Sequence, residues 1–133
     1  MCKIIFNFDQ VAEITSEDDL NDFLLSVREH YEPPNPIFMM IHQSGNMLYL
    51  GISSKGCHVV YKDASLNPPY YSSAGAKSNK NKHGYVEYMM SKENHVTEIR
   101  KSKTISFNDL VKITMSFYRM GTRPVNTIEW QID

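Results

Sequence analysis

The sequence has little cysteine and no long hydrophobic run, and these two absences exclude several classes of protein. Only Cys2 and Cys57 are cysteines among its 133 residues, which is too few for the disulfide framework of a small secreted protein. No stretch approaches the ~20 apolar residues that a membrane-spanning helix requires. The apolar run before Asp9 is shorter than the core of a signal peptide. We therefore expect a cytoplasmic protein with no disulfide and no membrane contact.

The sequence also lacks the local motifs that mark catalytic and cofactor sites. It contains no Gly-rich phosphate loop, no His-Glu-x-x-His, no Cys-x-x-Cys and no Gly-x-Ser-x-Gly. His42 and His58 could meet across strands and build a metal or acid–base site with Asp63 or Glu87. Cys57 cannot form a dyad with His58, because neighbouring strand residues point to opposite faces. A strand histidine is more often a packing residue, so we expect no enzyme activity, no metal and no cofactor.

The composition is that of one globular domain. Hydrophobic residues make up 41% of the chain and charged residues 22%, and this length suffices to bury one core. Without a repeat or a linker, residues 1–133 are expected to form a single domain. Runs of β-branched and aromatic residues predict strands at 3–8, 37–42, 47–52, 57–62, 85–90, 95–100 and 127–132.

Two amphipathic segments predict helices. In the first, Ser16 is a good N-cap and apolar residues recur at helical spacing as far as Tyr31, until Pro33 and the prolines after it end the helix. In the second, Ser106 is the N-cap and Gly121 stands where a left-handed C-terminal cap belongs. The predicted order is β-α-β-β-β-β-β-α-β, an α+β fold in which an antiparallel meander has both helices packed on one side.

Acidic residues concentrate in the first quarter of the chain. Residues 1–36 carry a net charge of −6, and the remaining residues carry +5. Carboxylates in the first turn of the first helix have a structural explanation, because the helix dipole favours negative charge there. Asp22 and Glu29 lie beyond that turn, so they are candidates for a surface that faces a partner.

Residues 63–84 predict a long loop, because the apolar pattern gives way to Asn, Pro, Ser, Gly and Lys. A loop of this length is usually functional or mobile. It contains two adjacent tyrosines and three lysines: Tyr70, Tyr71, Lys77, Lys80 and Lys82. The tyrosines could anchor a partner. The region from Lys77 to Tyr85 could instead form a small nucleic-acid-binding module, in which lysines contact phosphates and rings stack on bases.

The C-terminal third of the chain carries a family resemblance. A capped helix with the aromatic pair Phe117-Tyr118 is followed by Gly121-Thr-Arg-Pro124 and then by Ile128-Glu-Trp130. This succession resembles the ending of bacterial immunity proteins of polymorphic-toxin immunity family one. Residues 47–52 and 57–61 look like that family's central hairpin, so the resemblance covers residues 37–133.

The resemblance implies a small cytoplasmic inhibitor that binds the C-terminal domain of a cognate toxin and has no chemistry of its own. Family members include partners of deaminase toxins that act on DNA, and related immunity genes accompany nuclease toxins. Such a toxin has a basic cleft for nucleic acid, which an acidic surface could occupy. Neither a cofactor nor direct contact with nucleic acid is expected.

For an inhibitor of this kind, we assign hypothetical roles to particular residues. Six are candidates for toxin binding: Asp18, Asp22, Glu29, Asp63, Tyr70 and Tyr71. The carboxylates would contact cations around the toxin's active site, and the tyrosines would supply buried anchors. Three others are expected to determine the fold: Gly121, Pro124 and Trp130. Trp130 is expected in the core with its indole donor satisfied, and its replacement by alanine would then cost about 3 to 5 kcal/mol.

Overall fold

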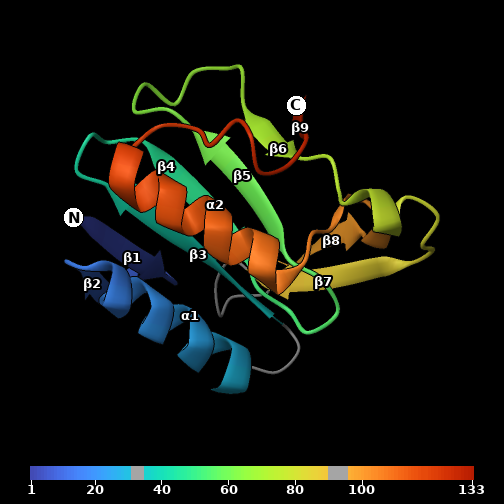
Figure 1. Ribbon diagram of the computed structural model, residues 1–133, viewed down its shortest axis with the longest axis horizontal. Coiled ribbons are helices and arrows are strands. Elements are labelled where there is room, and N and C mark those ends of the chain that lie inside the picture. The colour runs from blue at the N-terminus through green and yellow to red at the C-terminus, as the bar shows by residue number, and fades with distance from the viewer. Residues whose placement is uncertain (31–34, 90–95) are drawn as a thin grey trace.

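A computed structural model describes residues 1–30, 35–89 and 96–133. The fold is α+β, as expected, with two α-helices and a largely antiparallel sheet (Figure 1). The elements in chain order are β1 (Cys2–Phe6), β2 (Asp9–Ile14), α1 (Glu17–His30), β3 (Asn35–His42), β4 (Met47–Gly51), β5 (His58–Lys62), β6 (Tyr71–Ser73), η1 (Lys77–Asn79), β7 (Tyr85–Met89), β8 (Val96–Arg100), η2 (Lys101–Lys103), α2 (Phe107–Met120) and β9 (Trp130–Ile132).

The strands lie in the order β2-β1-β3-β4-β5-β6-β9. All neighbours along this path are antiparallel. The run from β3 to β6 is a meander, whereas β2 and α1 separate the neighbours β1 and β3 in the chain, and β9 reaches β6 from the C-terminus. The hairpin β7–β8 branches from the path, because β7 pairs with the start of β3. This contact is parallel and joins Asn35 to Tyr88 and Pro36 to Met89.

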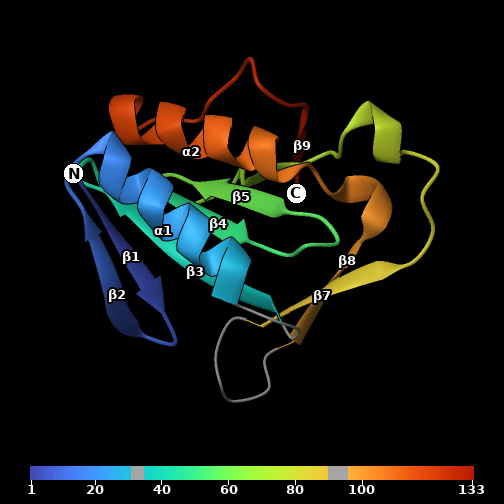
Figure 2. The same cartoon turned by 60° about the horizontal axis from the view of Figure 1, so that its bottom comes forward.

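Both helices cover the same face of the sheet (Figure 2). They run antiparallel to each other, because each end of α1 contacts the opposite end of α2. Glu17 at the start of α1 pairs with Arg119 near the end of α2. At the other end, the guanidinium carbon of Arg28 lies 4.6 Å from the ring centroid of Phe107. In the described part of the chain, no helix is long and apolar enough to cross a membrane.

The core lies between the helices and the sheet. Alternate residues of β3, β4 and β5 point toward the helices, and α1 and α2 add apolar stripes at helical spacing. Phe23 of α1 meets Phe38 of β3 edge to face, with ring centroids 5.1 Å apart. The fully buried members include Ile4, Leu20, Leu24, Phe38, Met40, Leu48, Leu50, Val59, Leu110, Ile113 and Phe117.

The predicted helix caps are confirmed. The backbone N–H of Asp19 donates to Ser16 Oγ over 3.0 Å, and that of Asp109 donates to Ser106 Oγ over 3.1 Å. Gly121 ends α2 in the left-handed conformation, with φ of 69°. Two parts of the prediction lie outside the described residues. The first is the end of the first helix, with Tyr31 and the prolines at 33 and 34, and the second is residues 90–95, which include the segment 91–94 between two predicted strands.

Two strands are present that the sequence pattern did not predict. Residues 9–14 form β2, although only Ile14 of this strand is buried. Such an edge strand shows no clear apolar alternation, so hydropathy misses it. The expected loop 63–84 contains β6, whose short segment Tyr71–Ser73 is held between β5 and β9, and also the single turn η1.

The last strand is shorter than its alternation of residues predicts. It begins at Trp130 rather than at residue 127. Ile132, an apolar residue that alternates with polar ones in this strand, is 69% exposed. β9 lies at the edge of the sheet and pairs with β6 alone, so fewer neighbours cover its side chains.

The turn between β1 and β2 places a bulky residue in an unfavourable conformation. Phe6 pairs with Asp9, which leaves Asn7 and Phe8 as a two-residue loop with φ of 54° and 69°. Positive φ at both positions is the pattern of a type I′ turn, which favours Asn followed by Gly. Asn7 fits this preference, whereas Phe8 does not and is 88% exposed.

Replacing Phe8 by glycine should therefore stabilise the protein. The left-handed conformation costs a residue with a Cβ about 1 to 2 kcal/mol. Glycine avoids this cost, but its larger loss of chain entropy on folding offsets part of the stabilisation. We expect Phe8→Gly to raise the free energy of unfolding by about 1 kcal/mol in urea denaturation. The control Val11→Gly, on the exposed strand β2, should destabilise. Equal destabilisation by both substitutions would contradict this description of the turn.

Candidate functional site

Three exposed carboxylates form a stripe along the outer side of α1. Leu20, Leu24 and Val27 are the residues that α1 buries, and at about 100° per residue the positions of Asp18, Asp22 and Glu29 fall on the opposite side of the helix. All three carboxylates are exposed, and in the described residues none of them forms an ion pair. The stripe extends over about 16 Å at 1.5 Å per residue. We call Asp18, Asp22 and Glu29 the acidic stripe.

Two other carboxylates of α1 have structural roles. Asp19 Oδ2 accepts hydrogen bonds from the backbone N–H of Thr15 over 3.1 Å and from its hydroxyl over 2.9 Å. These bonds from Thr15, together with those from Ser16, lower the pKa of Asp19. Glu17 pairs with Arg119. Asp19 and Glu17 are thus engaged at the helix start, as the dipole argument predicts, and the acidic stripe is what remains.

The tyrosines expected to join these carboxylates lie elsewhere. Tyr71 pairs with Tyr61 in the sheet at β6, on the far side of α2 from α1 (Figure 1). The guanidinium carbon of Arg123 lies 3.8 Å from the centroid of its ring. Tyr70 contacts Lys62, whose ammonium lies 4.6 Å from the Tyr70 ring centroid. Tyr70 and Tyr71 are therefore covered by different cations, and the structure does not bring them near the acidic stripe.

Asp63, the remaining toxin-binding candidate, organises a turn. Its Oδ1 accepts a hydrogen bond from the backbone N–H of Ser65 over 2.9 Å and another from the Ser65 hydroxyl. Its carbonyl accepts from the N–H of Leu66. This is a local Asx-type turn, and it also lies apart from the acidic stripe, after β5.

The residues behind the family resemblance contact one another. Trp130 Nε1 donates to the carbonyl of Pro124 over 2.6 Å, which satisfies the indole donor as expected. Arg123, whose guanidinium covers Tyr71, also lies near Trp130: its guanidinium carbon is 5.9 Å from the centroid of the Trp130 ring. Trp130 is half-buried rather than enclosed, so its truncation should cost less than the figure for a fully buried residue.

Gly121 is required by space as well as by its conformation. A Cβ at this position would lie 2.5 Å from the ring of His42. The carbonyl of Gly121 accepts hydrogen bonds from Asn46 Nδ2 over 2.7 Å and from Ser44 Oγ over 3.3 Å. The end of α2 is thereby joined to the β3–β4 turn.

The histidines do not form the site that their spacing allows. His42 pairs with Cys2 near the end of β3, whereas His58 pairs with Gly51 at the start of β5, toward the opposite end of the sheet. Cys57 is buried in the core and burial raises the pKa of its thiol to about 11. Among residues 1–30, 35–89 and 96–133, no three His, Cys, Asp or Glu side chains are grouped to hold a metal.

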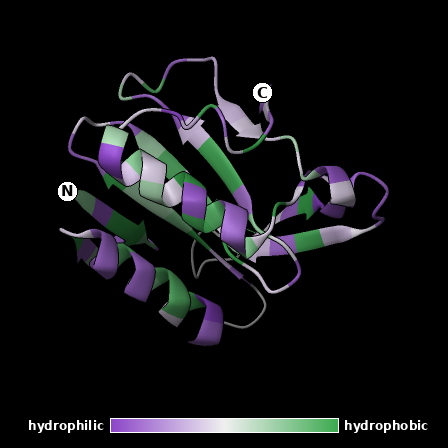
Figure 3. Ribbon diagram, in the orientation of Figure 1, coloured by the Kyte–Doolittle hydropathy of each residue, from purple (hydrophilic) through white to green (hydrophobic). Residues whose placement is uncertain are grey.

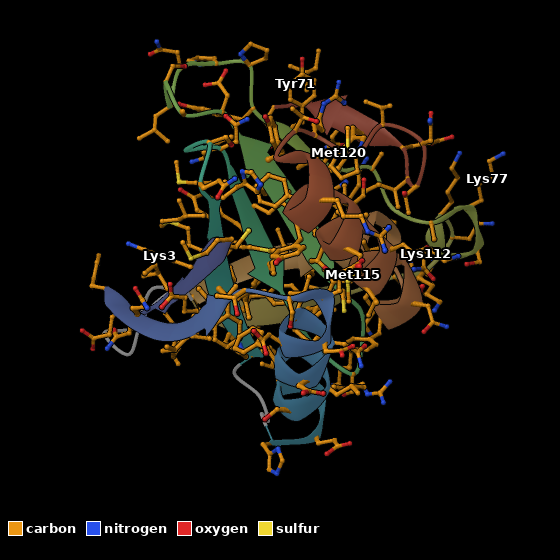
Figure 4. The ribbon with its side chains drawn as sticks, turned by 60° about the vertical axis from the view of Figure 1, so that its left-hand side comes forward. Lys3, Tyr71, Lys77, Lys112, Met115 and Met120 are labelled. Carbon is orange, nitrogen blue, oxygen red and sulfur yellow. The ribbon has the colours of Figure 1, made fainter. Side chains whose placement is uncertain are left out.

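A basic surface lies around η1 and η2, away from α1 and its acidic stripe. The lysines of η1 and the segment after it meet the basic residues around η2, since η1 contacts η2. A hollow of about 570 Å³ is lined in part by Lys80, Lys82, Tyr85 and Arg100. Figure 4 shows Lys77 of this surface far from Lys3 on β1. We call this set the basic surface: Lys77, Lys80, Lys82, Arg100, Lys101 and Lys103. Neither Tyr70 nor Tyr71 lines the hollow.

The sheet face that the helices leave uncovered is apolar, which the sequence analysis missed. On β3, every second residue belongs to this uncovered face and alternates with a residue of the core. These residues are half-buried: Ile37, Met39 and Ile41. Figure 3 shows the central strands as largely hydrophobic, whereas α1 carries a hydrophilic side. The segment Ile37–Ile41 is apolar at every position, a pattern that is typical of strands covered on both faces of a sheet. The sequence therefore contained a signal for an apolar second face.

The hairpin β7–β8 covers one end of this uncovered face and encloses an apolar cavity there. The cavity measures about 130 Å³ and is lined by Ile37, Tyr49, Gly51, His58, Val60, Tyr88, Thr97 and Ile99. The Tyr88 ring lies across Gly51, where a Cβ would come within 2.8 Å of it. The Tyr88 hydroxyl donates to the carbonyl of Gly56 over 2.6 Å, and burial raises the pKa of this phenol.

The position of His58 in the cavity wall predicts that stability depends on pH. Burial lowers the pKa of His58 to about 4, although Asp133 acts in the opposite direction. The unfolded chain, with a histidine pKa near 6.5, therefore binds the proton more tightly than the native protein. The free energy of unfolding should fall as the pH falls from about 6.5 to about 4, by up to about 3 kcal/mol.

Urea denaturation at several pH values tests this expectation. His58→Gln should lose the part of the pH dependence that His58 supplies, whereas His83→Gln, at an exposed position, should keep the wild-type profile. A His58→Gln profile parallel to the wild-type profile would show that His58 does not titrate in this way.

No protein-family model matches the chain, and no curated protein matches it. The described residues present three distinctive surfaces: the acidic stripe, the basic surface and the apolar face with its cavity.

Proposed function

We propose that this protein is an immunity protein, which binds a toxin domain acting on nucleic acid and neutralises it by occluding its active site. The observation that carries the proposal is the acidic stripe, three exposed carboxylates on the side of α1 that faces away from the core. An enzyme that acts on DNA or RNA holds cations around its active site to bind phosphates. A row of carboxylates is complementary to those cations.

The resemblance of the C-terminal third to immunity family one supports the proposal. The residues that carry the resemblance include Arg123, Pro124 and Trp130. Trp130 bonds to Pro124, and Arg123 lies over the rings of Trp130 and Tyr71. Residues in such a cluster maintain the fold and leave partner choice to other surfaces. This division agrees with an interface on α1, at the opposite edge of the sheet.

The mechanism needs no chemistry from this protein. The acidic stripe attracts the toxin's basic cleft through the long-range field, which raises the association rate. Docking of α1 then excludes the nucleic acid from the cleft. Inhibition takes place in the cytoplasm, where a delivered toxin meets its substrate, and Tyr70, Tyr71 and Asp63 contribute only if the toxin reaches across α2.

The small nucleic-acid-binding module remains a second candidate because of the basic surface. Six lysines and arginines lie in two segments that contact each other, residues 77–82 and 100–103. Three of them, Lys80, Lys82 and Arg100, line the hollow together with the exposed Tyr85. Cations beside an exposed ring form a common arrangement for binding single strands. The two candidates use opposite sides of the molecule, so they can be separated by substitution.

Titration against the toxin domain encoded beside the gene tests the first candidate. The wild-type protein should bind with nanomolar affinity or better, on the order of −12 kcal/mol, and should abolish the toxin's activity on nucleic acid. The triple variant Asp18→Asn, Asp22→Asn, Glu29→Gln should associate at least tenfold more slowly at low salt, and the difference should shrink as salt is added.

A matched control changes the same amount of charge elsewhere. Glu87, Glu98 and Glu129 are exposed and lie away from α1. The variant with all three replaced by Gln should associate at the wild-type rate. Equal slowing by both triple variants, or the absence of binding to any such toxin, would refute a specific role for the acidic stripe.

Oligonucleotide binding tests the second candidate. If the basic surface binds nucleic acid, a fluorescent single strand should bind with a steep salt dependence. Lys77→Gln, Lys80→Gln, Lys82→Gln should then reduce the slope by about 0.7 for each phosphate that the variant no longer neutralises. The control replaces Lys3, Lys55 and Lys112 by Gln. No binding at low salt, or equal effects of the two triple variants, would exclude the basic surface as a nucleic-acid site.

A further inference from the structure

The strained turn at Phe8 and the apolar cavity are two features that the proposed function leaves unused. Phe8 projects at the tip of the β1–β2 hairpin with 88% of its surface exposed and φ of 69°. Bulky residues rarely occupy such positions, and backbone strain of this kind concentrates at functional sites. The phenyl ring adds nothing to the core, so its retention at this cost points to a contact outside the chain.

The cavity has the size and the lining of a site for one aromatic ring. Its volume of about 130 Å³ is close to that of apolar cavities which take up benzene, about 150 Å³. Its walls include Ile37, Val60 and Ile99, which are half-buried and so retain access to solvent. The hydroxyl of Tyr88 is already occupied by Gly56, so a ring entering the cavity meets mainly apolar surface.

Each of the two features has a charged residue beside it, and these two charges are opposite. Asp9 follows Phe8 directly, on an exposed position of the acidic first quarter. Lys62 follows Val60 on the same face of β5, and its ammonium lies 4.8 Å from the ring centroid of Tyr49, a cavity wall. A ring with a carboxylate next to it would therefore fill the cavity and place the carboxylate toward Lys62.

We propose that the chain self-associates, with Phe8 of one copy inserted into the apolar cavity of a second copy and Asp9 beside that copy's Lys62. The occupant is a second copy because the chain itself supplies the exposed aromatic, the adjacent carboxylate and the cavity that fits them. Figure 2 shows the β1–β2 hairpin and the β7–β8 hairpin as separate projections of the sheet, so one molecule presents both halves of the contact.

Sedimentation velocity over a concentration series, from about 1 µM to about 500 µM, tests the proposal. The wild-type protein should show a sedimentation coefficient that rises with concentration. Phe8→Gly removes the ring without disturbing the turn, so its self-association should weaken at least tenfold in a folded protein. Val60→Phe fills the cavity from within and should have the same effect. Met120→Ser, at a 70% exposed site on α2, is the matched control and should associate like the wild type.

Mixing the two variants distinguishes this contact from any other. Phe8→Gly retains an open cavity and Val60→Phe retains the phenyl ring, so an equimolar mixture should associate although neither variant does so alone. A wild-type protein that stays monomeric throughout would overturn the proposal. Unchanged self-association of Phe8→Gly, or loss of association in Met120→Ser alone, would also overturn it. None of these outcomes depends on a toxin.

Discussion

The antiparallel packing of α1 and α2 on one face of the sheet is the interaction on which the remaining features depend. Leu20, Leu24 and Val27 of α1 and Leu110, Ile113 and Phe117 of α2 close the core. Burying these stripes turns the opposite side of α1 outward, and with it the acidic stripe. Among the described residues, the same packing leaves the other face of the sheet without a helical layer, and the β7–β8 hairpin covers part of that face. The acidic stripe and the uncovered sheet face are therefore consequences of one packing arrangement.

The chain separates its charges in space as well as in sequence. The acidic quarter forms β1, β2 and α1 at one edge of the sheet, whereas the basic surface lies around η1 and η2. The overall charge of −1 hides this separation, which matters because a partner responds to the local field within about 10 Å at 0.1 M salt. A basic partner would be attracted to α1 and repelled by the basic surface. A polyanion would be attracted to the basic surface and repelled by α1.

The sequence predicted the elements that have strong internal periodicity and failed where tertiary contacts decide. The caps at Ser16, Ser106 and Gly121 were predictable because they depend on neighbouring residues alone. Strand β2 was not, because only Ile14 is buried in it. Of the candidate site, the acidic stripe follows from helical spacing, whereas the separation of Tyr70 and Tyr71 from it depends on the order of the strands. The cavity depends on where the β7–β8 hairpin docks, and one sequence does not specify that.

Hydrogen–deuterium exchange on the complex with the toxin domain would locate the proposed interface without any substitution. If the acidic stripe binds the toxin domain, exchange should slow in α1, residues 17–30, when the complex forms, and should not change in the segment 77–82. Protection confined to residues 77–103, or to the uncovered sheet face, would contradict the assignment of toxin binding to the acidic stripe.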